Sequence, residues 1–175
     1  MAEGNAFETF AAGDPARYRT LARLWAASVT VVTVRPIDLA RPDDGFTATA
    51  FLTVSIDPPI VLVSATNASS AAAMMRDAGA FAVNLLARDQ RPLADAFAQP
   101  HEHRSFVWSD LPVVRDHAGV ALLAGSLGAF SATVRSFVDA GDHTLVLGDV
   151  TALHLGPAGE ALVYHDRAYR SIDPL

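Results

Sequence analysis

The stretch GFTATAFLTVSIDPP, from Gly45 to Pro59, decides the fold prediction because its residues alternate as the side chains of a β-strand do. One face of this strand is apolar and predicts contact with a core: Phe46, Ala48, Ala50, Leu52, Val54 and Ile56. The other face carries four hydroxyls around one aromatic ring: Thr47, Thr49, Phe51, Thr53 and Ser55. The Pro58-Pro59 pair is expected to end the strand, because proline cannot donate to a sheet ladder. A core explains the first face, whereas the hydroxyl face calls for a second explanation.

Composition limits the classes of protein to which this chain can belong. Its 175 residues are 51% hydrophobic and 18% charged, which predicts one folded domain over residues 1–175, with a disordered N-terminus at 1–14. The absence of cysteine excludes disulfides, a thiolate nucleophile and cysteine-ligated metal centres. All 13 basic residues are arginine, so a P-loop lysine and a pyridoxal Schiff base are also excluded.

Charge and hydropathy bear on partners and location. The formal net charge of −6 argues against nucleic acid as a partner. The longest mostly apolar stretch, Ala118 to Phe130, contains three glycines and is too short to cross a bilayer. No basic start followed by an apolar run resembles a signal peptide. We therefore expect a soluble cytoplasmic protein that binds neither nucleic acid nor membrane.

The segments around the quoted stretch continue a mainly β pattern. The further strands that we expect are Ser28–Arg35, Ile60–Ala65, Phe81–Leu86, Thr133–Val138, His143–Leu155 and Ala161–His165. Three short helices are expected: one from Asp14 to about Ala27, one after Asn67–Ser70 that ends at Gly79, and one capped by Asp89 that runs through Phe97. His101–Gly119 has no clean period and is interpreted as a long functional or interfacial loop. Because strands often follow one another directly, the order favours an antiparallel barrel with attached helices over a doubly wound parallel sheet.

Several motifs, in order, resemble the short flavin reductases that serve two-component monooxygenases. They are SVTVVTV, GFTATAFLTVSIDPPIVLVS, FAVNLLARDQRPLADAFA, Gly141-Asp142-His143 and YHDRAYRS, and they span the chain from about Leu21 to Ser171. The resemblance implies an FMN-binding split β-barrel, antiparallel and Greek-key-like, that uses NADH or NADPH to reduce FMN or FAD. It also implies a homodimer and a flavin-dependent monooxygenase as a partner.

The resemblance further implies a set of flavin contacts. Along the pyrimidine edge of the ring these are Thr47, Ala48, Thr49, Thr53, Val54 and Ser55. Around the ribityl phosphate they are Ser64, Thr66, Asn67, Ser69 and Ser70, at a helix N-terminus that offers unpaired amides to an anion. The remaining contacts are Phe106, Asp142, His143 and Tyr169. Many relatives have an arginine and a threonine in the phosphate turn where this chain has NASS, so the choice between FMN and FAD stays open.

His143 is the residue to which the resemblance gives a catalytic role, beside the nicotinamide and flavin rings. Hydride transfer needs no general base there, so we assign it positioning rather than proton transfer. Each of these sites also has a structural interpretation: threonines on a solvent-facing strand, a serine N-cap, or a histidine in a turn.

Other polar and aromatic residues are interpreted as structural. His101-Glu102-His103 would need further ligands to hold a metal, so a solvated loop is favoured and no metal site is predicted. Asn84, an amide in an apolar strand, must find a buried partner. Trp25 and Trp108 are assigned to the core or to an interface.

The sequence thus predicts an NAD(P)H:flavin oxidoreductase that supplies reduced flavin to a partner oxygenase. Two alternatives stay open. One is a non-catalytic, flavoredoxin-like electron carrier of the same fold. The other is an oxidase of a pyridoxine phosphate on this barrel, which the absence of lysine makes less attractive.

Overall fold

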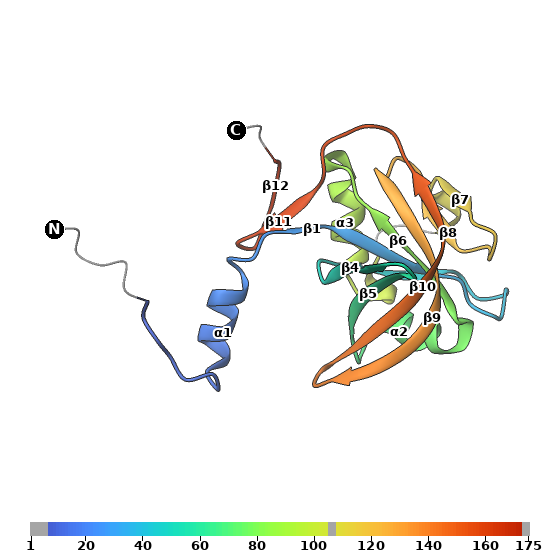
Figure 1. Ribbon diagram of the computed structural model, residues 1–175. Coiled ribbons are helices and arrows are strands. Elements are labelled where there is room, and N and C mark those ends of the chain that lie inside the picture. The colour runs from blue at the N-terminus through green and yellow to red at the C-terminus, as the bar shows by residue number, and fades with distance from the viewer. Residues whose placement is uncertain (1–6, 105–107, 173–175) are drawn as a thin grey trace.

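A seven-stranded antiparallel sheet forms the centre of the computed structural model, which describes residues 7–104 and 108–172 (Figure 1). Its strand order is β3-β2-β6-β9-β10-β5-β4. The strands are β2 (Thr30–Val34), β3 (Asp44–Ala48), β4 (Phe51–Ile56), β5 (Pro59–Thr66), β6 (Ala80–Leu85), β9 (Gly128–Ala140) and β10 (His143–Leu155). A three-stranded sheet joins β1 (Ala27–Ser28), β11 (Val163–His165) and β12 (Ala168–Arg170), and β7 (Val113–Arg115) pairs with β8 (Ala121–Leu123). The mainly β prediction is confirmed.

The quoted stretch is two strands and not one, which corrects the sequence prediction. β3 and β4 are the opposite edges of the sheet, yet only Thr49 and Ala50 separate them in the chain. The sheet must therefore curl until its edges approach, and the amide of Ser64 on β5 donates to the Ala50 carbonyl at 3.0 Å. No ladder joins β3 to β4 within the described residues. A period of two cannot signal this change of partner, because the alternation holds inside each strand.

The break also overturns part of the predicted apolar face. Phe46 and Ala48 on β3 contact the core as expected. On β4, however, Leu52, Val54 and Ile56 are 59%, 50% and 94% exposed, and Phe51 packs inward instead, 5.5 Å from the ring of Phe130. A shift of one position between two strands moves every side chain to the other face.

The core lies between the curled sheet and α2 (Ser70–Ala78). Its largest buried side chains include Val32, Val63, Met75 and Phe81, which are shielded almost completely from solvent. The helix begins and ends where the sequence predicts. The Ser69 hydroxyl accepts the Ala72 amide at 3.3 Å, and Gly79 ends the helix at φ +67°, a left-handed conformation that favours glycine.

Asn84 on β6 connects three parts of the fold, which confirms its structural interpretation. Its side chain is fully buried. Its Nδ2 donates to the Val31 carbonyl at 3.0 Å and to the Thr33 hydroxyl at 3.3 Å, and its Oδ1 accepts the Leu123 amide at 2.8 Å. The small β7–β8 sheet is thereby held against β2 and β6.

The first helix lies apart from the sheet. Asp14 caps α1 (Pro15–Ala22) by accepting the Ala16 amide at 2.9 Å, as predicted, but the helix ends well before Ala27. The apolar stripe that Tyr18 and Leu21 form on α1 is exposed to solvent, and so is Trp25 just beyond the helix, which is therefore not part of the core. Figure 1 shows α1 projecting from the body of the sheet.

The third helix has a different cap from the one that the sequence predicts. α3 (Arg91–Phe97) follows a 3₁₀ turn, η1 (Arg88–Gln90), and Asp89 lies within that turn, so its assignment as the cap is wrong. Gln90 is the polar side chain that points inward. Its Oε1 accepts the Ala87 amide at 3.0 Å, and its Nε2 donates to the Ala124 carbonyl at 2.9 Å.

The segment predicted as a long loop has more regular structure than expected. It contains 3₁₀ turns η2 (His101–His103) and η3 (Trp108–Asp110), followed by β7.

None of the helices in the described ranges has the length and hydropathy needed to span a membrane.

Candidate active site

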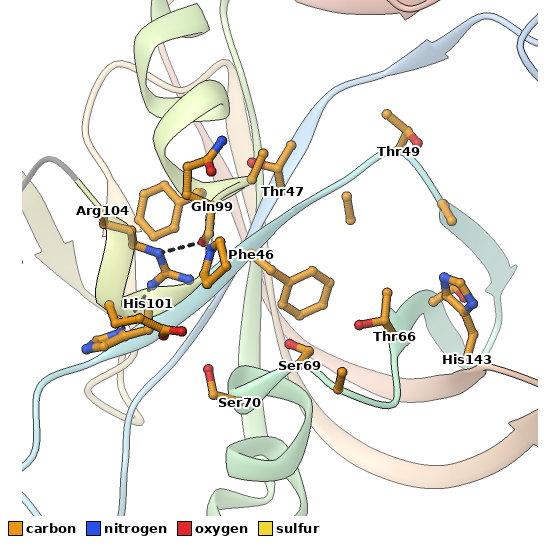
Figure 2. A pocket seen from close by; sticks show the side chains of 18 residues that line it. Phe46, Thr47, Thr49, Thr66, Ser69, Ser70, Gln99, His101, Arg104 and His143 are labelled. Carbon is orange, nitrogen blue, oxygen red and sulfur yellow. Dashed lines mark hydrogen bonds between the residues drawn. The ribbon is translucent and has the colours of Figure 1, made fainter.

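The candidate site is a cavity of about 530 Å³ bounded by β3, the N-terminus of α2 and the segment after α3 (Figure 2). Its lining residues are Phe46, Thr47, Ala48, Thr49, Ala50, Ser64, Thr66, Ala68, Ser69, Ser70, Phe97, Ala98, Gln99, Pro100, His101, Glu102, Arg104 and His143. Four distant parts of the chain thus meet around one space.

The structure brings together some of the predicted flavin contacts and leaves others outside. Those that line the cavity are Thr47, Ala48, Thr49, Ser64, Thr66, Ser69, Ser70 and His143. Those outside its lining are Thr53, Val54, Ser55, Asn67, Asp142 and Tyr169. Phe106 lies outside the described residues.

The hydroxyl of Thr47 already has a partner within the protein. Its Oγ1 donates to the Ala94 carbonyl at 2.6 Å, which fixes α3 against β3. Thr49 lies just beyond the end of β3, in the two-residue break, and is exposed. The break therefore leaves a hydroxyl and unladdered backbone at the cavity wall.

The N-terminus of α2 forms the second wall. Figure 2 shows Thr66, Ser69 and Ser70 along this side of the cavity. The first amides of a helix lack intrahelical acceptors and carry the positive end of the helix dipole, so this wall suits an anion. The Ser70 hydroxyl is engaged elsewhere, because it donates to Oδ2 of Asp44 at 2.5 Å.

A buried ion pair joins this wall to the third one. The side chains of Asp44 and Arg104 are only 3% and 6% exposed. Arg104 Nη1 donates to Asp44 Oδ1 at 2.6 Å, Nη2 donates to the Gly45 carbonyl at 2.6 Å, and Nε donates to the Gln99 carbonyl at 3.3 Å. The Gly45 amide also donates to Asp44 Oδ1, at 2.7 Å. β3, α2 and the segment after α3 are thereby held together around one carboxylate.

The Asp44 carboxyl is stabilised in its ionised form. Burial by itself would raise its pKa, but hydrogen bonds from Ser70, Arg104 and the Gly45 amide, together with the charge of Arg104, lower the pKa below its ordinary value. His101 Nδ1 lies 3.4 Å from the same carboxylate.

His143 stands at the far end of the cavity, at the tip of the β9–β10 hairpin. Its Nδ1 lies 2.7 Å from Oδ1 of Asp142. A hydrogen bond from His143, and then its charge, lower the pKa of the Asp142 carboxyl. Because an ionised carboxylate only accepts, this contact calls for a proton on Nδ1 and leaves Nε2 directed away from Asp142.

Asn67 lies outside the cavity lining and fastens the turn before α2 to this hairpin. Its Nδ2 donates to the Gly141 carbonyl at 3.1 Å, and its Oδ1 accepts the Thr144 hydroxyl at 2.8 Å. The amide of Asn67 donates to the Asp142 carbonyl at 3.0 Å. These hydrogen bonds fix the position of the α2 N-terminus relative to His143.

The tail motif packs away from the cavity. Tyr169 stacks edge-on against Tyr164, with ring centroids 5.4 Å apart, and the guanidinium of Arg91 lies 5.4 Å from its ring. Burial, followed by the charge of Asp95, raises the pKa of Tyr169 to about 12.

Sequence reasoning missed the Asp44–Arg104 pair and the residues of the third wall. Asp44 and Arg104 are far apart in the chain, and no spacing rule links them. The signal that was present is a pair of aspartates directly before an apolar strand, where one would be buried and in need of a cation. His101-Glu102-His103 forms a 3₁₀ turn at the cavity rim, and no group of His, Asp and Glu suited to a metal ion occurs in the described part of the chain.

A family model described as the flavin reductase like domain matches residues 22–173. The chain belongs to this family. Curated relatives of this flavin reductase-like chain include an NADH-dependent flavin reductase of a Rhodococcus species, 35% identical over 92% of this chain and 88% of the relative. The reductase component of 4-hydroxyphenylacetate 3-monooxygenase from Thermus thermophilus is 33% identical over 85% of this chain and 90% of the relative. A probable flavin reductase of Rhizobium meliloti is 37% identical over 79% of this chain, which spans only 43% of that relative.

Solved structures of the family share the flavin reductase-like fold. An NADH:FAD oxidoreductase of Streptomyces globisporus, in complex with NAD and FAD fragments, superimposes with a TM-score of 0.84 at 27% identity. The match covers 96% of this chain and 98% of that one.

Proposed function

We propose that this protein is an NAD(P)H:flavin oxidoreductase that reduces FMN or FAD. The observation that carries the proposal is that a broken strand edge, a helix N-terminus and a histidine, whose Nδ1 lies 2.7 Å from the Asp142 carboxylate, meet in one cavity. The names of the relatives support the reaction class. Reduced flavin would then pass to a flavin-dependent monooxygenase.

The residues that line the cavity suit both the ribityl phosphate and the pyrimidine edge of a flavin. The α2 amides and the hydroxyls of Ser64, Thr66 and Ser69 would hold the ribityl phosphate. Thr49 and the backbone at the β3–β4 break would contact the pyrimidine edge of the ring. Bound flavin supplies the electrophilic ring that accepts hydride from the nicotinamide.

His143 would orient the nicotinamide. With Nδ1 held by Asp142, its Nε2 can accept a hydrogen bond from the carboxamide of the dinucleotide. The protein contributes proximity, because it holds two planar ligands in one orientation and excludes water between them.

The proposal includes the architecture and assembly that the family resemblance implies. The curled sheet, with its edges joined by two residues, supports a split β-barrel in one domain. The exposed apolar stripe of α1 and the exposed apolar face of β4 support a homodimer that covers them. Use of a reduced nicotinamide co-substrate supports a cytoplasmic location.

A direct assay tests the proposed reaction. Purified protein is mixed with NADH or NADPH and with FMN or FAD, and pyridine nucleotide absorbance is followed against a control without protein. We expect oxidation with at least one pair. Flavin binding without oxidation by any of the four pairs would instead favour the electron-carrier alternative. Light scattering of the same sample tests the homodimer.

A further inference from the structure

The arginine that lines the cavity is already engaged within the protein. Arg104 is the one arginine among the described residues that line the cavity, and the chain contains no lysine. A guanidinium is the side chain best suited to bind a phosphate in two-pronged fashion. Here all three of its nitrogens donate to protein acceptors.

Asp44 accepts hydrogen bonds from both Arg104 and Ser70 at this end of the cavity. Its Oδ1 accepts Arg104 Nη1 at 2.6 Å, and its Oδ2 accepts the Ser70 hydroxyl at 2.5 Å. Arg104 and Ser70 line the cavity from different segments, so one carboxylate lies between the two strongest candidate phosphate donors. The pair is also close to neutral overall, because the lowered pKa of Asp44 keeps its carboxyl ionised beside the guanidinium.

We infer that Asp44 determines flavin specificity by withholding Arg104 and Ser70 from the phosphate, so that the site recognises the isoalloxazine ring and ribityl chain and accepts riboflavin nearly as well as FMN. The inference rests on the proposed function and narrows its substrate class to flavins with or without a phosphate. On this wall the phosphate then meets neutral donors, namely the first amides of α2 and the hydroxyls of Ser64, Thr66 and Ser69. Such neutral donors stabilise a bound phosphate less than a guanidinium that donates two hydrogen bonds to it.

The test compares the binding of riboflavin and FMN through the change in flavin fluorescence. For the unaltered protein, we expect the Kd for riboflavin to exceed that for FMN by less than about ten-fold. The variant Asp44→Asn keeps the shape of the side chain but removes its charge, so Arg104 becomes available to the phosphate. The ratio of the two Kd values should then rise by about ten-fold, the effect of one charge-assisted hydrogen bond.

The neighbouring aspartate provides a matched control. Asp43 is also buried and also pairs with one arginine, Arg115, at 2.5 Å, but Arg115 does not line the cavity, whereas Arg104 does. Asp43→Asn should therefore leave the ratio within about two-fold of the unaltered protein. The double variant Asp44→Asn/Arg104→Gln should return the ratio to its original value, which a merely structural role of Asp44 would not do.

Distinct outcomes overturn the inference and the proposed function. A ratio above about 100-fold in the unaltered protein, or an unchanged ratio in folded Asp44→Asn, overturns the inference alone. If Asp44→Asn does not fold, the salt dependence of flavin binding by the unaltered protein tests the inference instead. FMN and riboflavin binding should weaken in parallel up to about 0.5 M NaCl, and a ten-fold greater loss for FMN would contradict an engaged Arg104. Flavin binding without NADH or NADPH oxidation rejects only the proposed reaction, whereas failure to bind either flavin rejects both.

Discussion

Replacement of Asn84 by alanine should destabilise the protein more than any comparable surface change, because it removes a fully buried amide with three hydrogen bonds. The Leu123 amide then has no acceptor within reach, and a buried orphan donor costs about 1–3 kcal/mol. The Val31 carbonyl has a second lone pair, and Thr33 keeps its hydrogen bond to the Ala121 carbonyl at 2.6 Å, so these groups add less. With the small cavity included, we expect a loss of about 3 kcal/mol in the free energy of unfolding.

Urea unfolding, followed by far-ultraviolet circular dichroism at one protein concentration, measures this loss. At a slope of about 2 kcal/mol per molar urea, the midpoint should fall by about 1.5 M. Asn67→Ala is the matched control, because it removes the same amide from the surface, where water replaces the lost hydrogen bonds. It should cost less than about 1 kcal/mol. A loss below about 1 kcal/mol for Asn84→Ala, or equal losses for both variants, would refute the reasoning.

Three further predictions concern the cavity. Thr47→Val removes the hydroxyl that donates to the Ala94 carbonyl, so it should lower the free energy of unfolding by about 1 kcal/mol in a denaturation experiment. The Kd for flavin, measured by fluorescence titration, should stay within about two-fold. A large loss of flavin affinity would instead indicate that this hydroxyl contacts the ligand. His143→Ala should raise the KM for NADH by about ten-fold in steady-state kinetics while changing flavin binding little, and an unaltered KM and turnover would contradict the positioning role. The pKa of Asp44 is lower in the folded protein, so its stabilising contribution is complete above its ordinary pKa of 3.8 and is lost as pH falls through the folded value. The difference in unfolding free energy between the unaltered protein and Asp44→Asn should accordingly shrink from about pH 6 to pH 3, and a difference that grows would contradict this assignment.

Features that depend on near neighbours in the chain were predictable from sequence. The caps of α2 at Ser69 and Gly79 and the apolar runs of β5 and β6 follow from local backbone chemistry and side-chain period. Burial of Asn84 follows as well, because an amide inside an apolar strand needs a partner. Placement of His143 at the start of a strand after a tight turn was also correct.

Features that depend on which segments meet in space were decided by the tertiary structure alone. The break at Thr49 and Ala50 sends the chain from one edge of the sheet to the other and turns Leu52 and Ile56 toward solvent. The pairing of Asp44 with Arg104 arises only when α3 and the following turn close over β3. The physical reason is that a repeat of two or 3.6 residues reports only local geometry, whereas strand order and the balance of buried charge depend on contacts between distant residues.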